Sequence, residues 1–95
     1  MSVHTYRKKP VTVQAAQWDG TTESADAVLL WIRSNGGTAE SITDEHCTGV
    51  SYLAIDTLEG RMLASAGDFV VRGIVGEFHP VRGDIFEQTY ENADV

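Results

Sequence analysis

Hydrophobic and polar residues alternate in the first structured stretch of the chain. Val11, Val13 and Ala15 are separated by single polar residues, and a period of two is typical of a half-buried β-strand. An Asp-Gly pair, which is typical of turns, follows this stretch. The pattern therefore predicts a first strand over about residues 9–18.

The next segment has the spacing of a helix. Its apolar residues recur every three or four positions, at Ala25, Val28, Leu29 and Ile32. Thr21 or Thr22 is placed to cap the N-terminus of this helix. Asn35-Gly36-Gly37 is placed to end it, and Arg33 near the end complements the helix dipole. We predict one helix between these two caps.

Short strands and tight turns alternate in the second half of the chain. Residues 38–50 are polar without a sustained period, which predicts a loop that holds at most one short strand. Strands are then expected at residues 52–57, 61–64, 69–72 and 77–79, with turns at Glu59-Gly60, Gly67-Asp68 and Gly73–Gly76. We expect these four strands to form an antiparallel meander.

The C-terminal segment predicts a short helical turn. Asp84 is placed to cap it, and Glu87, three residues later, is placed to reach back and complete a capping box. The turn is expected to end near Tyr90, and residues 92–95 are expected to fray.

These elements together predict the fold class. A chain of 95 residues holds one core, so we expect a single domain over residues 1–95. The expected fold is α+β, with a small, mostly antiparallel sheet, one packed helix and a C-terminal helical turn. A partly closed barrel is the variant that the same pattern allows.

The net charge limits the classes of partner. The chain has 14 acidic and 7 basic residues and a formal charge of −7. Because such a surface repels phosphate backbones and anionic lipids, we expect neither duplex nucleic acid nor a membrane as partner. The chain has no run of about 20 apolar residues, and we expect no secretory signal, because the N-terminal residues lack the apolar core that such a signal requires. The single cysteine, Cys47, fits a reducing compartment, so we expect the cytoplasm.

The basic residues gather at the N-terminus. Residues 1–8 form a basic arm in which His4 precedes Arg7 and Lys8, and Lys9 follows directly. A solvated arm is the simplest interpretation, and a local contact with an anion is the alternative. A small sheet with one helix also leaves strand edges open, so we expect a homo-oligomer.

Several motifs occur together in one order along the chain. They are the Tyr-Arg-Lys-Lys-Pro start, Gln17-Trp18, Thr-Leu-Glu-Gly at 57–60, Gly-Asp-x-x-x-x-Gly at 67–73, residues 75–80, and Asp-Ile-Phe-Glu-x-Thr-Tyr-Glu at 84–91. In these motifs the chain resembles a family of small, uncharacterised bacteriophage and prophage proteins. The resemblance implies an accessory protein made in the cytoplasm of an infected bacterium. It implies no catalytic residues.

Groups that could carry metal or thiol chemistry lie in the polar loop. Residues 44–47 read Asp-Glu-His-Cys, but the side chains of neighbouring residues diverge, whereas a first coordination shell usually draws on separate segments. Cys47 with His46 or His79 lacks the electropositive surroundings that a thiolate nucleophile needs. We therefore expect no metal site and no cofactor.

Acidic and glycine residues of the turns have simple structural explanations. Asp68, Glu77 and Asp84 could converge as paired carboxylates for acid–base catalysis, but turn formation and capping explain Asp68 and Asp84 more simply. Gly73 and Gly76 resemble a phosphate loop only superficially, because no lysine follows them. We expect no catalytic residues.

Candidate ligand-binding residues are spread over the chain. Trp18 ends the first predicted strand, where an exposed indole could stack on a planar ligand; a position in the core, usual for aromatic residues of a small domain, is the alternative. Arginines at neighbouring parts of the predicted sheet could hold phosphate or carboxylate with two hydrogen bonds each; three exposed, separately paired charges are the alternative. The candidate set is Trp18, Arg61, Arg72, Glu77, His79 and Arg82.

Three classes of function remain after this reading. The first is a non-enzymatic bacteriophage accessory protein that binds a small anionic ligand between subunits, such as a host nucleotide immune signal, and so counters host defence. The second is a protein-interaction module that binds a host or phage protein through a sheet edge or an apolar patch. The third is a small enzyme, which would require Asp68, Glu77, His79 or Cys47 to share one cleft.

Overall fold

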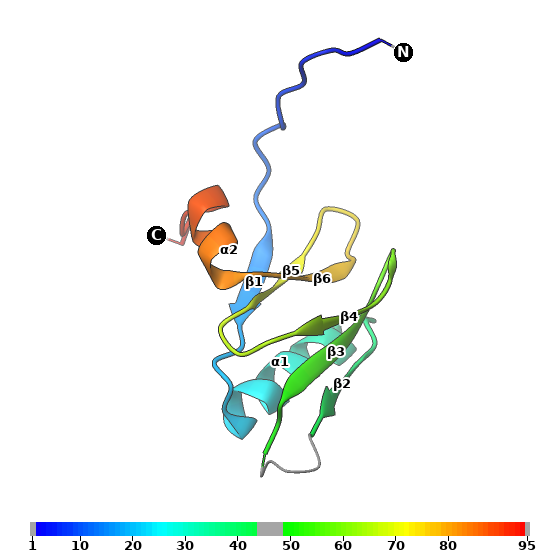
Figure 1. The fold of residues 1–95 in the computed structure, drawn as a ribbon, viewed down its shortest axis with the longest axis vertical. Coiled ribbons are helices and arrows are strands. Elements are labelled where there is room, and N and C mark those ends of the chain that lie inside the picture. The colour runs from blue at the N-terminus through cyan, green and yellow to red at the C-terminus, as the bar shows by residue number, and fades with distance from the viewer. Residues whose placement is uncertain (1, 44–48, 95) are drawn as a thin grey trace.

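A computed structural model describes residues 2–43 and 49–94 and has an α+β fold (Figure 1). Its elements, in chain order, are β1 (Gln14–Gln17), α1 (Thr22–Ser34), β2 (Ala39–Ile42), β3 (Tyr52–Thr57), β4 (Gly60–Ala64), β5 (Phe69–Arg72), β6 (Phe78–Val81) and α2 (Gly83–Thr89). The predicted fold class, helix and short strands are confirmed.

The described strands form two separate three-stranded antiparallel sheets, with orders β1-β5-β6 and β2-β3-β4. The expected four-stranded meander is therefore wrong, because β4 pairs with β3 and β5 pairs with β1 and β6. The turn at Gly67 carries the chain from one sheet to the other. The described strands do not close into a barrel.

The first strand is shorter than predicted. It covers Gln14–Gln17 instead of residues 9–18. Its partner β5 has four residues, so the ladder runs only from Gln14 opposite Arg72 to Gln17 opposite Phe69. Alternating hydrophobicity at residues 11–13 lacks a partner strand in the described chain, and Pro10 has no N–H to donate.

The helix α1 begins and ends at the predicted caps. The hydroxyl of Thr21 accepts a hydrogen bond from Ser24 N at 3.1 Å, which satisfies one of the free N–H groups of the first turn. Asp19 accepts from the hydroxyl and the N–H of Thr21 at 2.7 and 2.9 Å. These bonds favour the charged carboxylate and lower the pKa of Asp19 below its ordinary value of 3.8.

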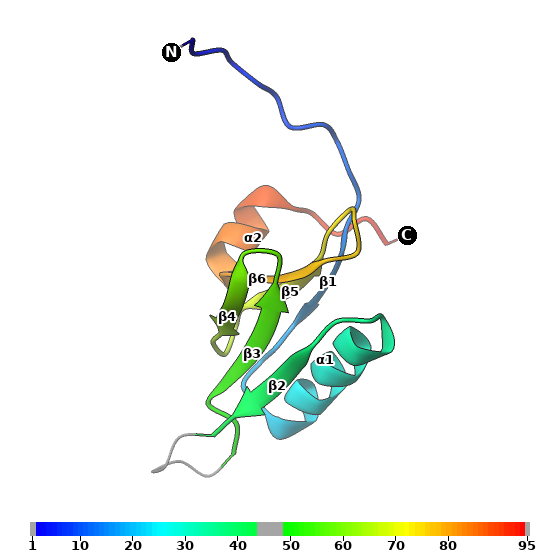
Figure 2. The same ribbon diagram turned by 90° about the vertical axis from the view of Figure 1, so that its right-hand side faces the viewer.

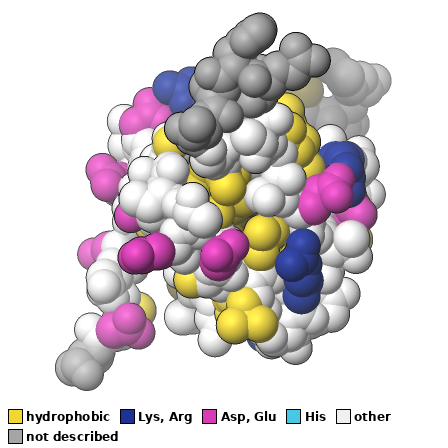
Figure 3. All heavy atoms as spheres, turned by 90° about the horizontal axis from the view of Figure 1, so that it is seen from below, with side chains coloured by type: hydrophobic (Ala, Val, Ile, Leu, Met, Phe, Trp, Pro, Cys, Tyr) yellow, Lys and Arg dark blue, Asp and Glu magenta, His cyan; other side chains and the backbone are white. Residues whose placement is uncertain are grey.

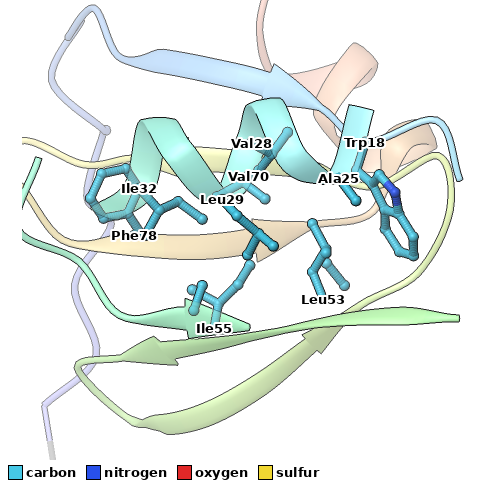
Figure 4. Close-up of a cluster of buried hydrophobic side chains, with 11 residues drawn as sticks. Trp18, Ala25, Val28, Leu29, Ile32, Leu53, Ile55, Val70 and Phe78 are labelled. Carbon is cyan, nitrogen blue, oxygen red and sulfur yellow. The ribbon is translucent and has the colours of Figure 1, made fainter. Parts of the chain in front are cut away.

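The core lies between α1 and the two sheets (Figure 4). Its fully buried side chains include Trp18, Ile32, Leu53 and Val70. Phe78 is also buried and meets Trp31 edge to face, with ring centroids 5.2 Å apart. The helix therefore joins the two sheets, because its one apolar stripe contacts residues from both.

The helix α2 is not capped as predicted. Arg82 is the N-cap and makes no side-chain capping bond, while Asp84 lies in the first turn and accepts from Ile85 N at 2.9 Å. The expected capping box is therefore wrong. Phe86 holds α2 on the sheet instead, because its ring stacks on that of Phe69 in β5, with ring centroids 3.9 Å apart. The Phe86 ring also stacks on that of Tyr90, with ring centroids 4.8 Å apart.

The N-terminal arm, defined here as residues 2–13, has no helix or strand and projects away from the domain (Figures 1 and 2). Its base contacts the end of α2. Lys8 Nζ donates to the Tyr90 hydroxyl at 3.2 Å and lies 5.0 Å from the centre of that ring.

Candidate functional site

Arg72 lies in a hollow at the end of the β1-β5-β6 sheet. The hollow has a volume of about 380 Å³ and is lined by Arg72, residues 12–14, Gly73, Ile74 and Gly76. Gln14 is opposite Arg72 in the β1–β5 ladder, and the glycines belong to the turn between β5 and β6. We call this the Arg72 hollow.

The guanidinium of Arg72 is incompletely satisfied. Its Nη1 donates to Gln14 Oε1 at 3.3 Å, and its Nε is buried without a hydrogen-bond partner among the described residues. A buried donor without a partner costs about 1–3 kcal/mol relative to a satisfied one. An acceptor that reached this nitrogen would recover part of this cost.

Glu77 separates the Arg72 hollow from a second concavity. Its backbone carbonyl accepts from Gly73 N at 2.8 Å, and its carboxyl group lies against the Cα of Gly73, where a β-carbon would clash with it. One carboxyl oxygen, Oε2, is also buried without a partner among the described residues. An unpaired acid and an unpaired arginine nitrogen therefore flank the same glycine.

The second concavity, which we call the hairpin groove, lies where the β3–β4 hairpin meets β6. It has a volume of about 390 Å³ and is lined by Thr57, Leu58, Glu59, Met62 and residues 77–80. Leu58 and Met62 are 77% and 44% exposed. The groove thus combines exposed apolar side chains with two acids and His79, and it has no arginine.

The three arginines do not converge, and the alternative of separately paired, exposed charges holds for Arg61 and Arg82. Arg61 forms ion pairs with Glu40 at 2.6 Å and Asp56 at 3.0 Å. The hydrogen bond to Asp56, followed by that to Glu40, raises the pKa of Arg61 above its ordinary value. Because side chains alternate along a strand, Arg61 lies with Asp56 on the face of the β2-β3-β4 sheet opposite Ile55 and the core.

Arg82 is also separated from Arg72. It follows β6 directly and pairs with Asp84 at 2.8 Å. In the β5–β6 ladder, Arg72 is opposite Phe78 at one end and Val81 is opposite Phe69 at the other. Arg82 therefore lies beyond the far end of the ladder from Arg72.

The prediction of an exposed Trp18 indole is wrong. The side chain is fully buried between α1 and the sheets (Figure 4). The ladder continues past β1, since Trp18 N donates to Asp68 O at 3.0 Å, and this directs the ring into the core. It is not available at the surface to stack on a ligand in this conformation.

The remaining candidates lie in different parts of the described chain, apart from Glu77 and His79. Asp68 Oδ2 accepts from Ser65 N at 2.9 Å and holds the turn between the sheets, as predicted. Glu77 and His79 share the hairpin groove. Residues 44–47, with Cys47, lie outside the described residues, and elsewhere no three His, Cys, Asp or Glu side chains are placed to hold a metal.

Sequence reasoning missed the apolar part of the hairpin groove. Leu58 is a turn residue beside Glu59-Gly60, and Met62 faces the core side of β4, opposite Ile55. An exposed leucine at the tip of a tight hairpin turn was a usable signal, because such tips are usually polar.

In comparisons with known proteins, no family model, curated protein or solved structure matches this chain. Within the described residues, neither helix has both the length and the hydropathy needed to cross a membrane. The two concavities are therefore the features of the molecule that bear on its function.

Proposed function

We propose that this protein is a non-enzymatic binding protein for a small anionic ligand, whose anionic group is held by Arg72. The observation that carries the proposal is the unsatisfied guanidinium. Arg61 and Arg82 are neutralised by carboxylates, whereas among the described residues Arg72 Nε has no partner and no acid lines its hollow.

The chemistry of the hollow favours a phosphorylated ligand. A guanidinium presents a planar set of donors that matches phosphate or carboxylate oxygens. The carboxyl group of Glu77 lies against Gly73 on the side of the hairpin groove and would accept from a ligand hydroxyl or amine that extends past this glycine. A nucleotide carries both kinds of group, so nucleotides are the class we propose to test first.

The resemblance to small bacteriophage proteins supports a role inside an infected bacterium. An abundant protein that binds a host nucleotide signal tightly lowers its free concentration by mass action and requires no catalysis. Because the Arg72 hollow adjoins the edge strand β1, a second copy at this edge would enclose the ligand further.

The test is thermal unfolding against cyclic mononucleotides and dinucleotides, nucleoside triphosphates, phosphorylated sugars and inorganic phosphate. A ligand at 100 times its Kd stabilises the folded state by about 2.7 kcal/mol, which raises Tm by roughly 10 °C or more in a domain of this size. We expect this shift to be lost in Arg72→Gln and weakened in Arg72→Lys.

Arg82→Gln is the matched control, because it removes an exposed guanidinium of the same hairpin that already has a carboxylate partner. It should leave the shift unchanged. A panel without any shift, or a shift that persists in Arg72→Gln, would overturn the proposal.

A second candidate function, a protein-interaction module, is favoured by the hairpin groove. Leu58 and Met62 are exposed side by side with Glu59, and exposed apolar side chains rimmed by charge are typical of interaction surfaces. A direct measurement is binding of a labelled peptide that alternates apolar and basic residues. Loss of its binding in Leu58→Ser, but not in Leu30→Ser on the exposed side of α1, would support this candidate.

A further inference from the structure

The N-terminal arm holds large apolar side chains that are almost fully exposed to solvent. Val3 and Tyr6 are 82% and 87% exposed, and the arm leads away from the domain in both views (Figures 1 and 2). Its contact with Tyr90 through Lys8 is exposed, and docking of Lys8 on another surface would replace it. Apolar side chains held this far from the domain gain free energy if another surface covers them.

The arm and the rest of the chain have opposite charges. The arm contains Arg7, Lys8 and Lys9, which are three of the seven basic residues, and no acidic residue. Residues 14–95 therefore hold four basic and 14 acidic residues, a formal charge of −10. Figure 3 shows acidic side chains spread over the end opposite the arm. The arm is thus attracted to the domain of another copy.

The hairpin groove matches the arm in chemistry. Leu58 and Met62 supply an apolar floor and are 77% and 44% exposed, while Glu59 and Glu77 supply negative charge. In the arm, Tyr6 directly precedes Arg7 and Lys8. An extended segment can therefore place an apolar ring on Leu58 and Met62 with its cationic groups beside the two acids.

We propose that the N-terminal arm of one copy docks in the hairpin groove of a second copy, and that the exchange is reciprocal. Residues 2–9 alone span up to about 26 Å when extended, and the arm leads away from its own domain. A reciprocal exchange closes on itself and yields a dimer. The proposal rests on the second candidate function, since it names the partner of that groove, and its tests leave Arg72 unchanged.

The first test is the mass in solution. Sedimentation across the micromolar range should show the full chain at twice its monomer mass of 10.4 kDa. Removal of residues 2–9 should yield a folded monomer, because no side chain of this segment belongs to the core. Circular dichroism checks that the fold is retained. A monomeric full chain, or a dimer that survives the deletion, would overturn the exchange.

The second test is a charge swap. Arg7→Glu/Lys8→Glu/Lys9→Glu makes the arm acidic, and Glu59→Lys/Met62→Lys makes the groove basic. Each variant alone should be monomeric, because arm and groove then repel. Their mixture should form a heterodimer, since the acidic arm meets the basic groove and the unchanged basic arm meets the unchanged acidic groove. A mixture that stays monomeric contradicts the proposal.

A third measurement separates the exchange from the general role of the groove. A labelled peptide of residues 2–13 should bind the arm-deleted protein and lose at least tenfold in affinity in Glu59→Lys/Met62→Lys. If this peptide fails to bind while another apolar-basic peptide still requires Leu58, the groove is an interaction surface and the exchange is wrong. If neither binds, both proposals fail.

Discussion

Large apolar side chains are buried on the side of the domain that α1 covers. They are exposed on the side where the β3–β4 hairpin meets β6. Under α1, Trp18 and Ile32 are fully buried and Phe78 is 3% exposed. At the hairpin groove, Leu58 and Met62 are 77% and 44% exposed. Hydrophobicity is therefore no guide to the functional surface. The difference is whether the apolar face of α1 covers the side chain.

This difference changes which aromatic residues count as functional. Trp18 is adjacent to a turn, as ligand-stacking residues often are, yet it is a core residue because the β1–β5 ladder continues through its N–H to Asp68. The side chains left for binding are those at hairpin ends, such as Leu58 and Arg72. Substitutions on the two sides should separate stability from binding.

The largest expected effect on stability is at Trp18. Trp18→Ala should lower the free energy of unfolding by about 3–5 kcal/mol, because it empties a fully enclosed site. Trp18→Phe should cost much less, since it also removes the unpartnered indole N–H. Urea unfolding monitored by circular dichroism measures both. A Trp18→Ala loss below about 1 kcal/mol would show that the core does not depend on this ring.

Gly37, between α1 and β2, should give the next largest effect. A β-carbon there would lie 2.6 Å from Ile32 Cγ2 and 2.7 Å from Phe78 Cδ2, so Gly37→Ala should cost about 1–3 kcal/mol through overpacking. Gly36→Asn is the comparison, because a β-carbon at Gly36 meets nothing within 4 Å and asparagine tolerates its positive φ. Equal costs at both glycines would contradict this account.

The helix cap is expected to contribute less. Thr21→Ala removes the acceptor for Ser24 N and should lower the free energy of unfolding by about 1 kcal/mol. Thr22→Ala, one residue later in the first turn of α1, should change it by no more than a few tenths. The pair is compared by the midpoint of thermal unfolding.

Asp19 should give a smaller, pH-dependent effect. Its pKa in the folded protein is lowered from the ordinary value of 3.8 by the bonds from Thr21. Its contribution to stability is therefore complete above that ordinary value and is lost as pH falls through the lower, folded value. Asp19→Asn should therefore flatten the decrease in Tm below about pH 4. An unchanged acid profile would mean that other carboxyl groups control it.

The smallest effect on stability is expected at Leu58. Leu58→Ser should change the free energy of unfolding by less than about 0.5 kcal/mol, because the side chain is already 77% exposed. The same variant should weaken binding of the arm peptide and shift the full chain toward monomer. A stable dimer in Leu58→Ser would mean that the arm is bound by the acidic residues of the groove and not by its apolar floor.

The sequence determined the elements whose signals are local. The spacing of Ala25 to Ile32, with Thr21 before and Asn35 after, set the limits of α1, because caps and a periodic stripe act within one or two turns. Gly60, Gly67 and Gly76 marked the turns, and each has a positive φ that favours glycine. The α+β class follows from these elements alone.

Tertiary structure decided how the strands were divided and which candidate residues came together. Alternation along a strand cannot show which strand is its partner, so the separation of β4 from β5, and with it the outward position of Arg61, was not readable from the chain. For the same reason the sequence could not show that Trp18 is a core residue and not part of a binding site. Arg72 was named from the sequence, but its lack of a carboxylate partner depends on which side chains the folded chain brings near it.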